Sequence, residues 1–107
     1  MKAEISPVEL RKEKKKYKLI DVREDWEYRE GHIEGAENIP FSTFEWTERE
    51  GKIPKDQPLV VYCLHGIRSH RILKFLQEKG YKKACHLLGG FEAYQQENNR
   101  PMKNVRN

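Results

Sequence analysis

Short apolar runs alternate along this chain with segments of helical spacing. The clearest run is Leu59–Tyr62, which is β-branched, fully apolar or aromatic, and preceded by a turn with prolines at both ends, residues 54–58. Four further runs predict strands at residues 4–5, 18–22, 35–40 and 84–88. Because helical segments separate most of these runs, the pattern favours an α/β domain with a mainly parallel, five-stranded sheet.

The helical segments begin and end at residues that are typical of helix termini. Ser6-Pro7-Val8-Glu9 predicts a capping box with proline at the first helical position, and a helix to about Lys16. Ser42-Thr43-Phe44-Glu45 predicts a second capping box, with a helix towards Glu50. The remaining helices are expected over residues 25–30, stopped by Gly31, over 69–79, capped by Ser69 and stopped by Gly80, and over 91–98.

Length and composition favour one compact domain. The chain has 107 residues, which predicts a single domain with its core at about 3–98 and a basic tail at 99–107. No apolar run is long enough to span a membrane, and residues 1–4 lack the apolar stretch of a secretory signal. Two cysteines without C-x-x-C spacing fit a reducing compartment. We therefore expect a soluble, cytoplasmic protein.

The net charge of +4 comes largely from the basic runs 11–16 and 100–106. Such runs usually form solvated helix faces, so neither a nucleic acid nor a membrane is the expected partner. The positive field favours anionic substrates or an acidic protein partner.

Cys63 lies where ligands bind in an open parallel sheet, at the carboxyl end of a strand and before a loop and a helix. Inward-pointing N–H groups of the loop and the positive end of the helix favour the thiolate, the reactive form. Gly66 suits a backbone position of positive φ or a close approach to an anion. Arg68 supplies a charge suited to an oxyanion, and His65 a further hydrogen-bond donor.

Each of these residues also has a structural interpretation. Cys63 can be a buried core thiol, since free cysteine packs as a small hydrophobic side chain. Arg68 can bind loop carbonyls or a neighbouring carboxylate, and we expect a mixed role. His65 on an exposed loop needs no function at all.

Several segments together resemble a rhodanese domain, over nearly the whole chain. They are residues 19–24, 27–28, 31–36 and 38–40, then Val60-Val61-Tyr62-Cys63 with Gly66 and Arg68-Ser69, and finally residues 87–93. The resemblance implies a rhodanese-like α/β fold in which Cys63 is the nucleophile. It also implies a substrate-binding loop made of Leu64, His65, Gly66, Ile67, Arg68 and Ser69.

The implied chemistry is sulfur transfer by covalent catalysis. A small anionic donor such as thiosulfate gives its outer sulfur to Cys63, and cyanide or a thiol then takes it from the persulfide. A protein is a further possible donor or acceptor, and the resemblance implies no metal or other cofactor.

Other positions of the family pattern belong to the scaffold, and two features of this sequence depart from that pattern. Asp21 and Arg23 are expected beside the pocket, with Arg23 in a buried ion pair with an acidic residue. His32 is expected to pack in its loop. Tyr94 stands where the family often has tryptophan, and the Leu64–Ile67 loop segment lacks the charged pattern of tandem thiosulfate-specific enzymes.

Cysteine phosphatases and arsenate reductases are one set of alternatives. Their strand–loop–helix is similar, but their loop is one residue longer than the four residues between Cys63 and Arg68. There is also no obvious aspartic general acid in the loop. A persulfide carrier for protein donors, or a regulatory binding module, is a second alternative, although such modules often lack the cysteine.

A metal site is the weakest of the catalytic alternatives. Cys63, His65, Cys85 and His86 are of ligand type but lack zinc-ligand spacing. Cys85 and His86 are adjacent on a predicted strand and so should face opposite sides of the sheet. Cys85 is therefore expected in the core, with a resolving role towards Cys63 left open.

Overall fold

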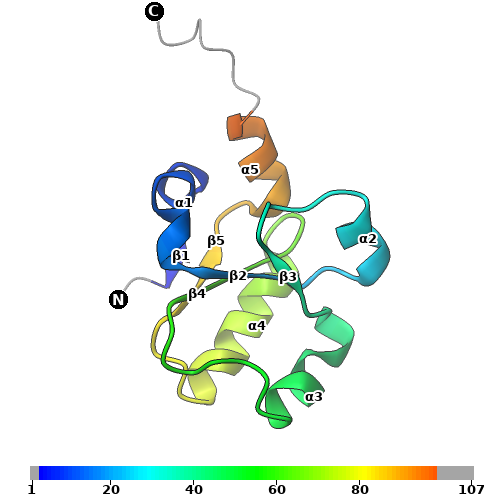
Figure 1. The fold of residues 1–107 in the computed structure, drawn as a ribbon, viewed down its shortest axis with the longest axis vertical. Helices are drawn as coiled ribbons and strands as arrows, with labels where there is room; N and C mark the ends of the chain where they lie inside the picture. The colour runs from blue at the N-terminus through cyan, green and yellow to red at the C-terminus, as the bar shows by residue number, and fades with distance from the viewer. Residues whose placement is uncertain (1–2, 99–107) are drawn as a thin grey trace, which may run out of the picture.

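The computed structural model describes residues 3–98, which form one five-stranded parallel sheet with helices on both faces (Figure 1). Neighbouring strands follow the order β1-β5-β4-β2-β3, and every pair is parallel. The strands are β1 (Glu4–Ile5), β2 (Lys18–Asp21), β3 (Glu37–Asn38), β4 (Leu59–Tyr62) and β5 (Ala84–Leu87). The predicted α/β fold is thus confirmed, with β4 at the centre of the sheet.

The helices divide between the two faces of the sheet. In Figure 1, α1 and α5 lie on one side, and α3 and α4 lie on the other. The helices are α1 (Pro7–Glu13), α2 (Asp25–Arg29), α3 (Phe44–Arg49), α4 (Ile67–Glu78) and α5 (Gly90–Asn98), with 3-10 turns η1 (Lys14–Lys16) and η2 (Phe41–Thr43). The predicted first helix reaches Lys16 only through η1, and α4 begins two residues before the predicted start.

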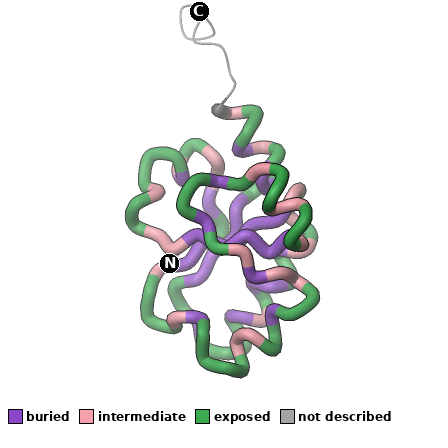
Figure 2. Tube along the Cα trace, turned by 45° about the vertical axis from the view of Figure 1, so that its right-hand side comes forward, coloured by how far each residue is buried: buried purple, intermediate pink, exposed green. Residues whose placement is uncertain are grey.

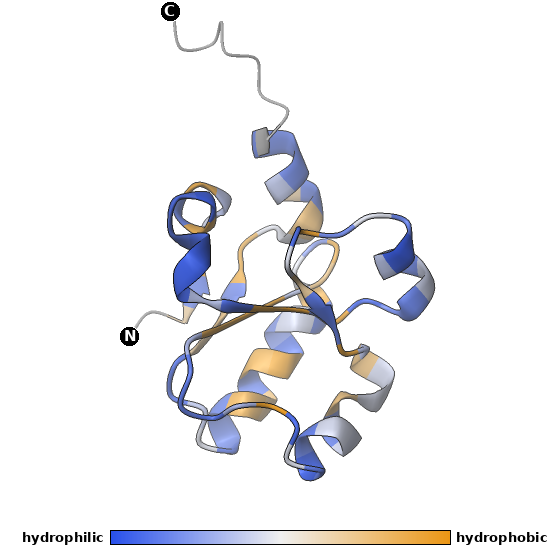
Figure 3. Cartoon of the chain, viewed as in Figure 1, coloured by the Kyte–Doolittle hydropathy of each residue, from blue (hydrophilic) through white to orange (hydrophobic). Residues whose placement is uncertain are grey.

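Each face of the sheet carries its own apolar cluster. All four residues of β4 are buried, as expected of a central parallel strand covered on both sides (Figure 2). Its Leu59 and Val61 pack towards α3 and α4, whereas Val60 and Tyr62 pack towards α1 and α5. In Figure 3 the apolar colour lies along the central strands and on the part of α4 that faces them.

The two predicted capping boxes have different outcomes. At α1, Ser6 and Glu9 exchange both backbone–side-chain hydrogen bonds, each of 3.1 Å, so this prediction is confirmed. The second prediction is wrong, because the chain turns through η2 and the side chain of Thr43 makes no cap bond to α3 in the described structure. Ser42 Oγ instead donates to Glu24 Oε1 at 2.9 Å.

Within residues 3–98, none of the helices is both long and apolar enough to cross a membrane. The predicted basic tail, 99–107, lies outside the described residues.

Candidate active site

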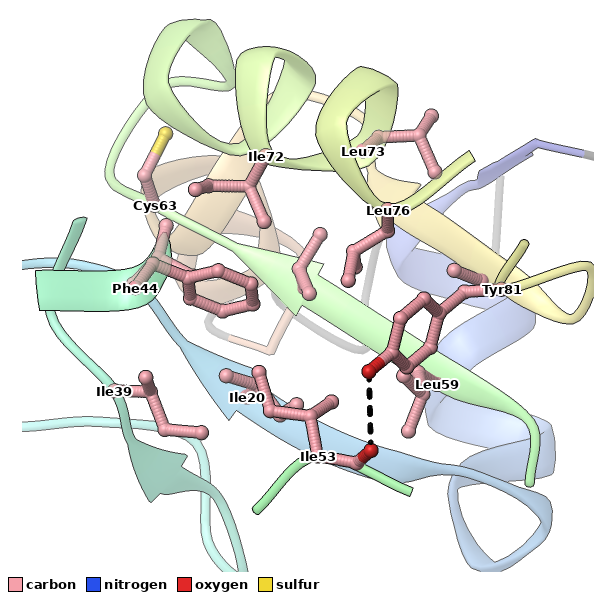
Figure 4. Close-up of a cluster of buried hydrophobic side chains, with 13 residues drawn as sticks. Ile20, Ile39, Phe44, Ile53, Leu59, Cys63, Ile72, Leu73, Leu76 and Tyr81 are labelled. Atoms are coloured by element: carbon pink, nitrogen blue, oxygen red, sulfur yellow. Dashed lines mark hydrogen bonds between the residues drawn. The ribbon is translucent and has the colours of Figure 1, made fainter. Parts of the chain in front are cut away.

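Cys63 directly follows the central strand β4, at the carboxyl end of the sheet. Its side chain is nearly inaccessible, with 1% of the residue surface exposed. In Figure 4, Cys63 lies at one end of the apolar cluster that includes Phe44 and Ile72, beside α4. This placement follows from the sequence, since a buried β-branched strand carries the next residue to the edge where parallel strands end.

The backbone after Cys63 wraps around its sulfur. The N–H groups of Gly66 and Ser69 both donate to Cys63 Sγ, at 3.1 and 3.4 Å. Gly66 has a φ of 113°, in the left-handed region, as its sequence position predicted. The sulfur therefore sits in a cradle of backbone donors at the start of α4, an environment that stabilises negative charge on sulfur.

Ser69 does not cap α4, so that prediction is wrong. The left-handed turn at Gly66 makes this glycine the N-cap, and α4 begins at Ile67. Ser69 consequently lies inside the first turn, fully buried, with its hydroxyl 3.6 Å from Cys63 Sγ. The backbone N–H and the side-chain hydroxyl of Ser69 thus both face the cysteine.

The start of α5 holds the loop from the other side. Phe91 N–H donates to the carbonyl of Cys63 at 2.8 Å, and Glu92 N–H donates to that of Leu64 at 3.1 Å. At Gly90 the approach is so close that a Cβ would meet the Leu64 carbonyl oxygen and lie 2.7 Å from that of Cys63. The sequence predicted a strand at 84–88 and a helix over 91–98, but not this docking between them and the loop.

Arg68 is paired with a carboxylate. Its two terminal nitrogens donate to Glu27 Oε1 and Oε2 at 2.8 and 3.1 Å, and the side chains are 32% and 13% exposed. The hydrogen bonds from Arg68 hold the pKa of Glu27 below its usual value, and the same bonds raise the pKa of Arg68. The structural part of the expected mixed role for Arg68 is therefore present, as a link from α4 to α2.

A second ion pair is buried beside the loop. Arg23 donates from Nε to Asp21 Oδ1 at 3.1 Å and from a terminal nitrogen to Oδ2 at 2.8 Å. The same terminal nitrogen reaches the carbonyl of Gly31 at 2.6 Å, and the guanidinium lies 4.5 Å from the ring centre of Phe91. The predicted buried pair for Arg23 is confirmed. Its partner is the aspartate two residues earlier, which is fully buried, while Arg23 lines a cavity together with Leu64 and Phe91.

His65 turns away from the sulfur. Its Nε2 lies 2.8 Å from Glu92 Oε1, and both side chains are more than half exposed. The expected hydrogen bond from His65 into the pocket is therefore not formed, because α5 offers a nearer carboxylate. Of the other loop residues, Leu64 packs on the cluster under α5, and Ile67 is exposed.

The two cysteines lie on opposite faces of the sheet. Cys63 belongs to the cluster under α4, while Cys85 belongs to the cluster under α5 and lies with Sγ 3.6 Å from the Leu59 carbonyl oxygen. The core position of Cys85 is confirmed, and this separation gives no support to a resolving role. Across residues 3–98, the structure contains no group of three or more metal-ligating side chains.

His86 is the residue that sequence reasoning missed. It faces α4 from β5, is buried, and has Nδ1 3.3 Å from Ser69 Oγ. Burial, with a further contribution from His70, lowers its pKa and so keeps the ring neutral. The sequence predicted that His86 lies on a strand and faces the side of the sheet opposite to Cys85, and both predictions are confirmed. Its contact with Ser69 was not predicted, because it depends on the residue at which α4 begins. His32, by contrast, packs in its loop as expected, stacked on Tyr28.

Comparison with known proteins gives one consistent result. The family description "Rhodanese-like domain" matches residues 6–97. An uncharacterised protein of Bacillus subtilis, YqhL, is 40% identical over 80 residues, covering 75% of this chain and 62% of that protein. Thiosulfate sulfurtransferase GlpE of Coxiella burnetii is 37% identical over 76 residues, covering 71% of this chain and 69% of that one.

A further relative is much longer, and the solved structures agree with the fold. The chain spans only 24% of the probable adenylyltransferase/sulfurtransferase MoeZ of Mycobacterium tuberculosis, at 40% identity. A rhodanese-related protein of Thermoplasma volcanium superposes with a TM-score of 0.82 at 30% identity, covering 94% of this chain and 96% of that one. The human single-domain sulfurtransferase TSTD1 gives 0.78 at 25% identity, covering 91% and 98%.

Proposed function

This chain belongs to the rhodanese-like domain family, and from that membership we propose that it is a sulfurtransferase that carries sulfur on Cys63. The observation that carries the proposal is the cradle around the cysteine, in which Gly66 N–H and Ser69 N–H both point at Sγ. A sulfur atom held among backbone donors is suited to the thiolate that must attack a donor.

The first half-reaction loads the cysteine. The Cys63 thiolate attacks the outer sulfur of thiosulfate, a new S–S bond forms on Cys63, and the S–S bond of the donor breaks. Sulfite leaves with the electron pair of that bond. The persulfide then carries the negative charge, and the N–H donors of the loop are in position to stabilise it as they stabilise the thiolate.

The second half-reaction unloads the cysteine. Cyanide or a thiolate attacks the outer sulfur of the persulfide, and the Cys63 thiolate leaves and is ready for the next donor. We assign binding of donor and acceptor to the loop Leu64–Ser69, with Arg68 acting in two ways. Its ion pair with Glu27 holds the loop against α2, and its remaining exposed surface contributes charge to anion binding.

Thiosulfate is the donor to test first, because several matched relatives are named thiosulfate sulfurtransferase. The chain is 35% identical over 86 residues to a thiosulfate sulfurtransferase GlpE of Shewanella oneidensis, covering 80% of this chain and 83% of that one. A protein donor remains the second candidate for the same cysteine.

The decisive experiment is intact-mass measurement after incubation with thiosulfate. We expect the mass of one sulfur atom to be added, equimolar sulfite to be released, and the added mass to disappear when cyanide is supplied. Cys63→Ser should abolish the addition. The matched control is Cys85→Ser, which alters the other buried cysteine on the opposite face of the sheet and should load normally.

Two other outcomes would separate the alternatives. Loading by a low-molecular-weight persulfide but not by thiosulfate would indicate a persulfide carrier. Cys63-dependent hydrolysis of p-nitrophenyl phosphate without sulfur loading would replace the proposal by a phosphatase, an activity that the name of one similar protein, from Rhodopseudomonas palustris at 25% identity, also suggests. Absence of every reaction, in a folded and reduced protein, would leave a binding module.

A further inference from the structure

Three buried side chains form a continuous line from the sulfur to β5. Cys63 Sγ lies 3.6 Å from Ser69 Oγ, and Ser69 Oγ lies 3.3 Å from Nδ1 of His86. Cys63 and Ser69 are at most 1% exposed, and His86 is 6% exposed. The contacts join three separate elements, the end of β4, the first turn of α4 and the middle of β5.

The line ends at a surface cavity. His86 lines this cavity together with residues of β1, of the loop after Cys63, of α4 and of the segment before α5. The ionisable groups that share the cavity with His86 are Glu4, His65, His70 and Arg71. His86 is therefore the point at which the buried line meets a hollow open to solvent.

Cys63 has little direct contact with bulk water, since 1% of its residue surface is exposed. The attacking form is the thiolate, so its proton has to leave this buried site. The backbone donors of Gly66 and Ser69 stabilise the charge but accept no proton. Among the neighbours of Cys63 Sγ, Ser69 Oγ is the group able to accept a proton and pass one on.

We propose that Ser69 and His86 form a proton relay that ionises Cys63, with His86 acting as a positioning residue through Ser69. The S–H proton moves to Ser69 Oγ while the electron pair stays on sulfur. The former Ser69 hydroxyl proton moves to Nδ1 of His86, and Nε2 of His86 releases its own proton to water in the cavity.

The net result of these transfers is one proton in solvent, a thiolate, and a neutral His86 protonated at Nδ1 instead of Nε2. In that state Nδ1–H donates to Ser69 Oγ, so the serine hydroxyl is free to point at the thiolate. Cys63 then has three donors in place of two. Before ionisation the serine hydroxyl donates to Nδ1 of His86, and the carbonyl of Gly66, 3.3 Å from Ser69 Oγ, is its alternative acceptor.

The surroundings of His86 disfavour its protonated form, so a proton that reaches the ring is not retained there. Burial and the neighbouring His70, whose ring centre is 5.3 Å away, both lower the pKa of His86, while Glu4 opposes them weakly. The protonated form of His86 is therefore disfavoured, which suits a group that passes its proton on to the cavity.

The test measures ionisation of Cys63 directly, so it does not depend on the sulfurtransferase proposal on which this inference builds. The rate of Cys63 alkylation by iodoacetamide is followed by peptide mass from mildly acidic to mildly alkaline pH. Ser69→Ala and His86→Asn should each move the midpoint of the pH–rate profile upward by about one unit, which slows alkylation about tenfold at pH values below the wild-type midpoint. His32→Asn, a histidine stacked on Tyr28 outside this cavity, is the matched control and should leave the midpoint close to wild type.

The double variant distinguishes a relay from two separate structural effects. If the residues act in one line, Ser69→Ala/His86→Asn is no slower than either single variant, whereas independent effects would multiply to about a hundredfold. A multiplied loss, or a midpoint that does not move in Ser69→Ala, overturns the proposal. Circular dichroism and thermal melting check each fold, and if His86→Asn does not fold, His86→Gln replaces it in the single and double variants. Failure of thiosulfate loading with a normal relay result would affect only the proposed activity.

Discussion

Glu27 faces Arg68 across the gap between α2 and α4, and the two side chains meet through a pair of hydrogen bonds of 2.8 and 3.1 Å. The arginine at the far end of the cysteine loop is thus held by the protein itself before any anion arrives. Glu27 Oε1 also accepts the backbone N–H of Glu24 at 2.9 Å, so one carboxylate joins the start of α2 to the start of α4.

Glu27→Gln should lower the free energy of unfolding by about 1–2 kcal/mol at neutral pH, because it removes the charge of a largely buried partner and keeps its shape. Urea unfolding measures the loss. The matched control is Glu37→Gln, whose carboxylate pairs with Lys18 but is 54% exposed, and it should change stability by less than about 0.5 kcal/mol. Equal effects of the two variants would contradict a structural role for the Arg68 pair.

The same pair predicts a pH dependence of stability. The pKa of Glu27 in the folded protein lies below its ordinary value of 4.5, chiefly through the hydrogen bonds from Arg68. Its contribution is therefore fully present above the unfolded pKa and is lost as pH falls through the folded pKa. The stability difference between wild type and Glu27→Gln should be constant near neutrality and shrink below 4.5, as measured by urea unfolding at successive pH values. A difference that grows on acidification would contradict the assignment.

Asp21→Asn should be more damaging than Glu27→Gln. It leaves the Arg23 guanidinium buried without a counter-charge, for which we expect a loss of about 3 kcal/mol. Glu13→Gln is the control, since Glu13 pairs with Lys16 on the surface, with side chains 46% and 67% exposed. Thermal or urea unfolding of both variants gives the comparison, and an Asp21→Asn protein as stable as the control would show that the buried pair contributes little.

Local relationships were the ones that the sequence could predict. Cys63 was located because it follows a buried β-branched strand, and the buried ion pair of Arg23 was expected because Arg23 follows a strand end. The Ser6 capping box lies within four consecutive residues and formed as predicted. In each case the determining contacts are made within a few residues of chain.

Relationships that depend on how elements dock were not predictable in this way. Arg68 and Glu27 are 41 residues apart, and nothing in either segment specifies that α2 packs beside α4. The role of Ser69 changed because a left-handed Gly66 starts the helix two residues early. Because of that shift, Ser69 contacts Cys63 and His86 instead of capping the helix. Residue spacing alone does not predict these contacts.

His65→Gln should change sulfur transfer by less than about twofold, because the side chains of His65 and Glu92 are both more than half exposed and such surface pairs contribute little. Its partner Glu92 lies 2.8 Å away on α5, so Glu92→Gln should have the same small effect. Steady-state rates with thiosulfate and cyanide measure both. A loss of about tenfold in His65→Gln alone would show instead that His65 touches the donor, as the sequence had suggested.

Gly90→Ala should damage both the stability and the reactivity of the cysteine loop. Gly90 has a φ of 68°, and an added Cβ would lie 2.5 Å from the Leu64 carbonyl carbon and 2.7 Å from the Cys63 carbonyl oxygen. Because these are backbone atoms of the loop, they must move away, and the hydrogen bond from Phe91 N–H to the Cys63 carbonyl is then lost. We expect a loss of about 2–4 kcal/mol in unfolding free energy and a fall of at least about tenfold in persulfide formation.

Gly80→Ala separates the effect of the clash from that of backbone conformation. Gly80 also has a left-handed φ, 91°, but no heavy atom lies within 4 Å of its added Cβ. Gly80→Ala should lower the free energy of unfolding by about 1 kcal/mol, through the unfavourable backbone conformation alone, and should leave persulfide formation unchanged. Mass-detected sulfur loading and urea unfolding of the two variants test this directly. If Gly90→Ala loads sulfur as fast as Gly80→Ala, the loop tolerates displacement from α5, and the contact of Gly90 with Leu64 is not what positions Cys63.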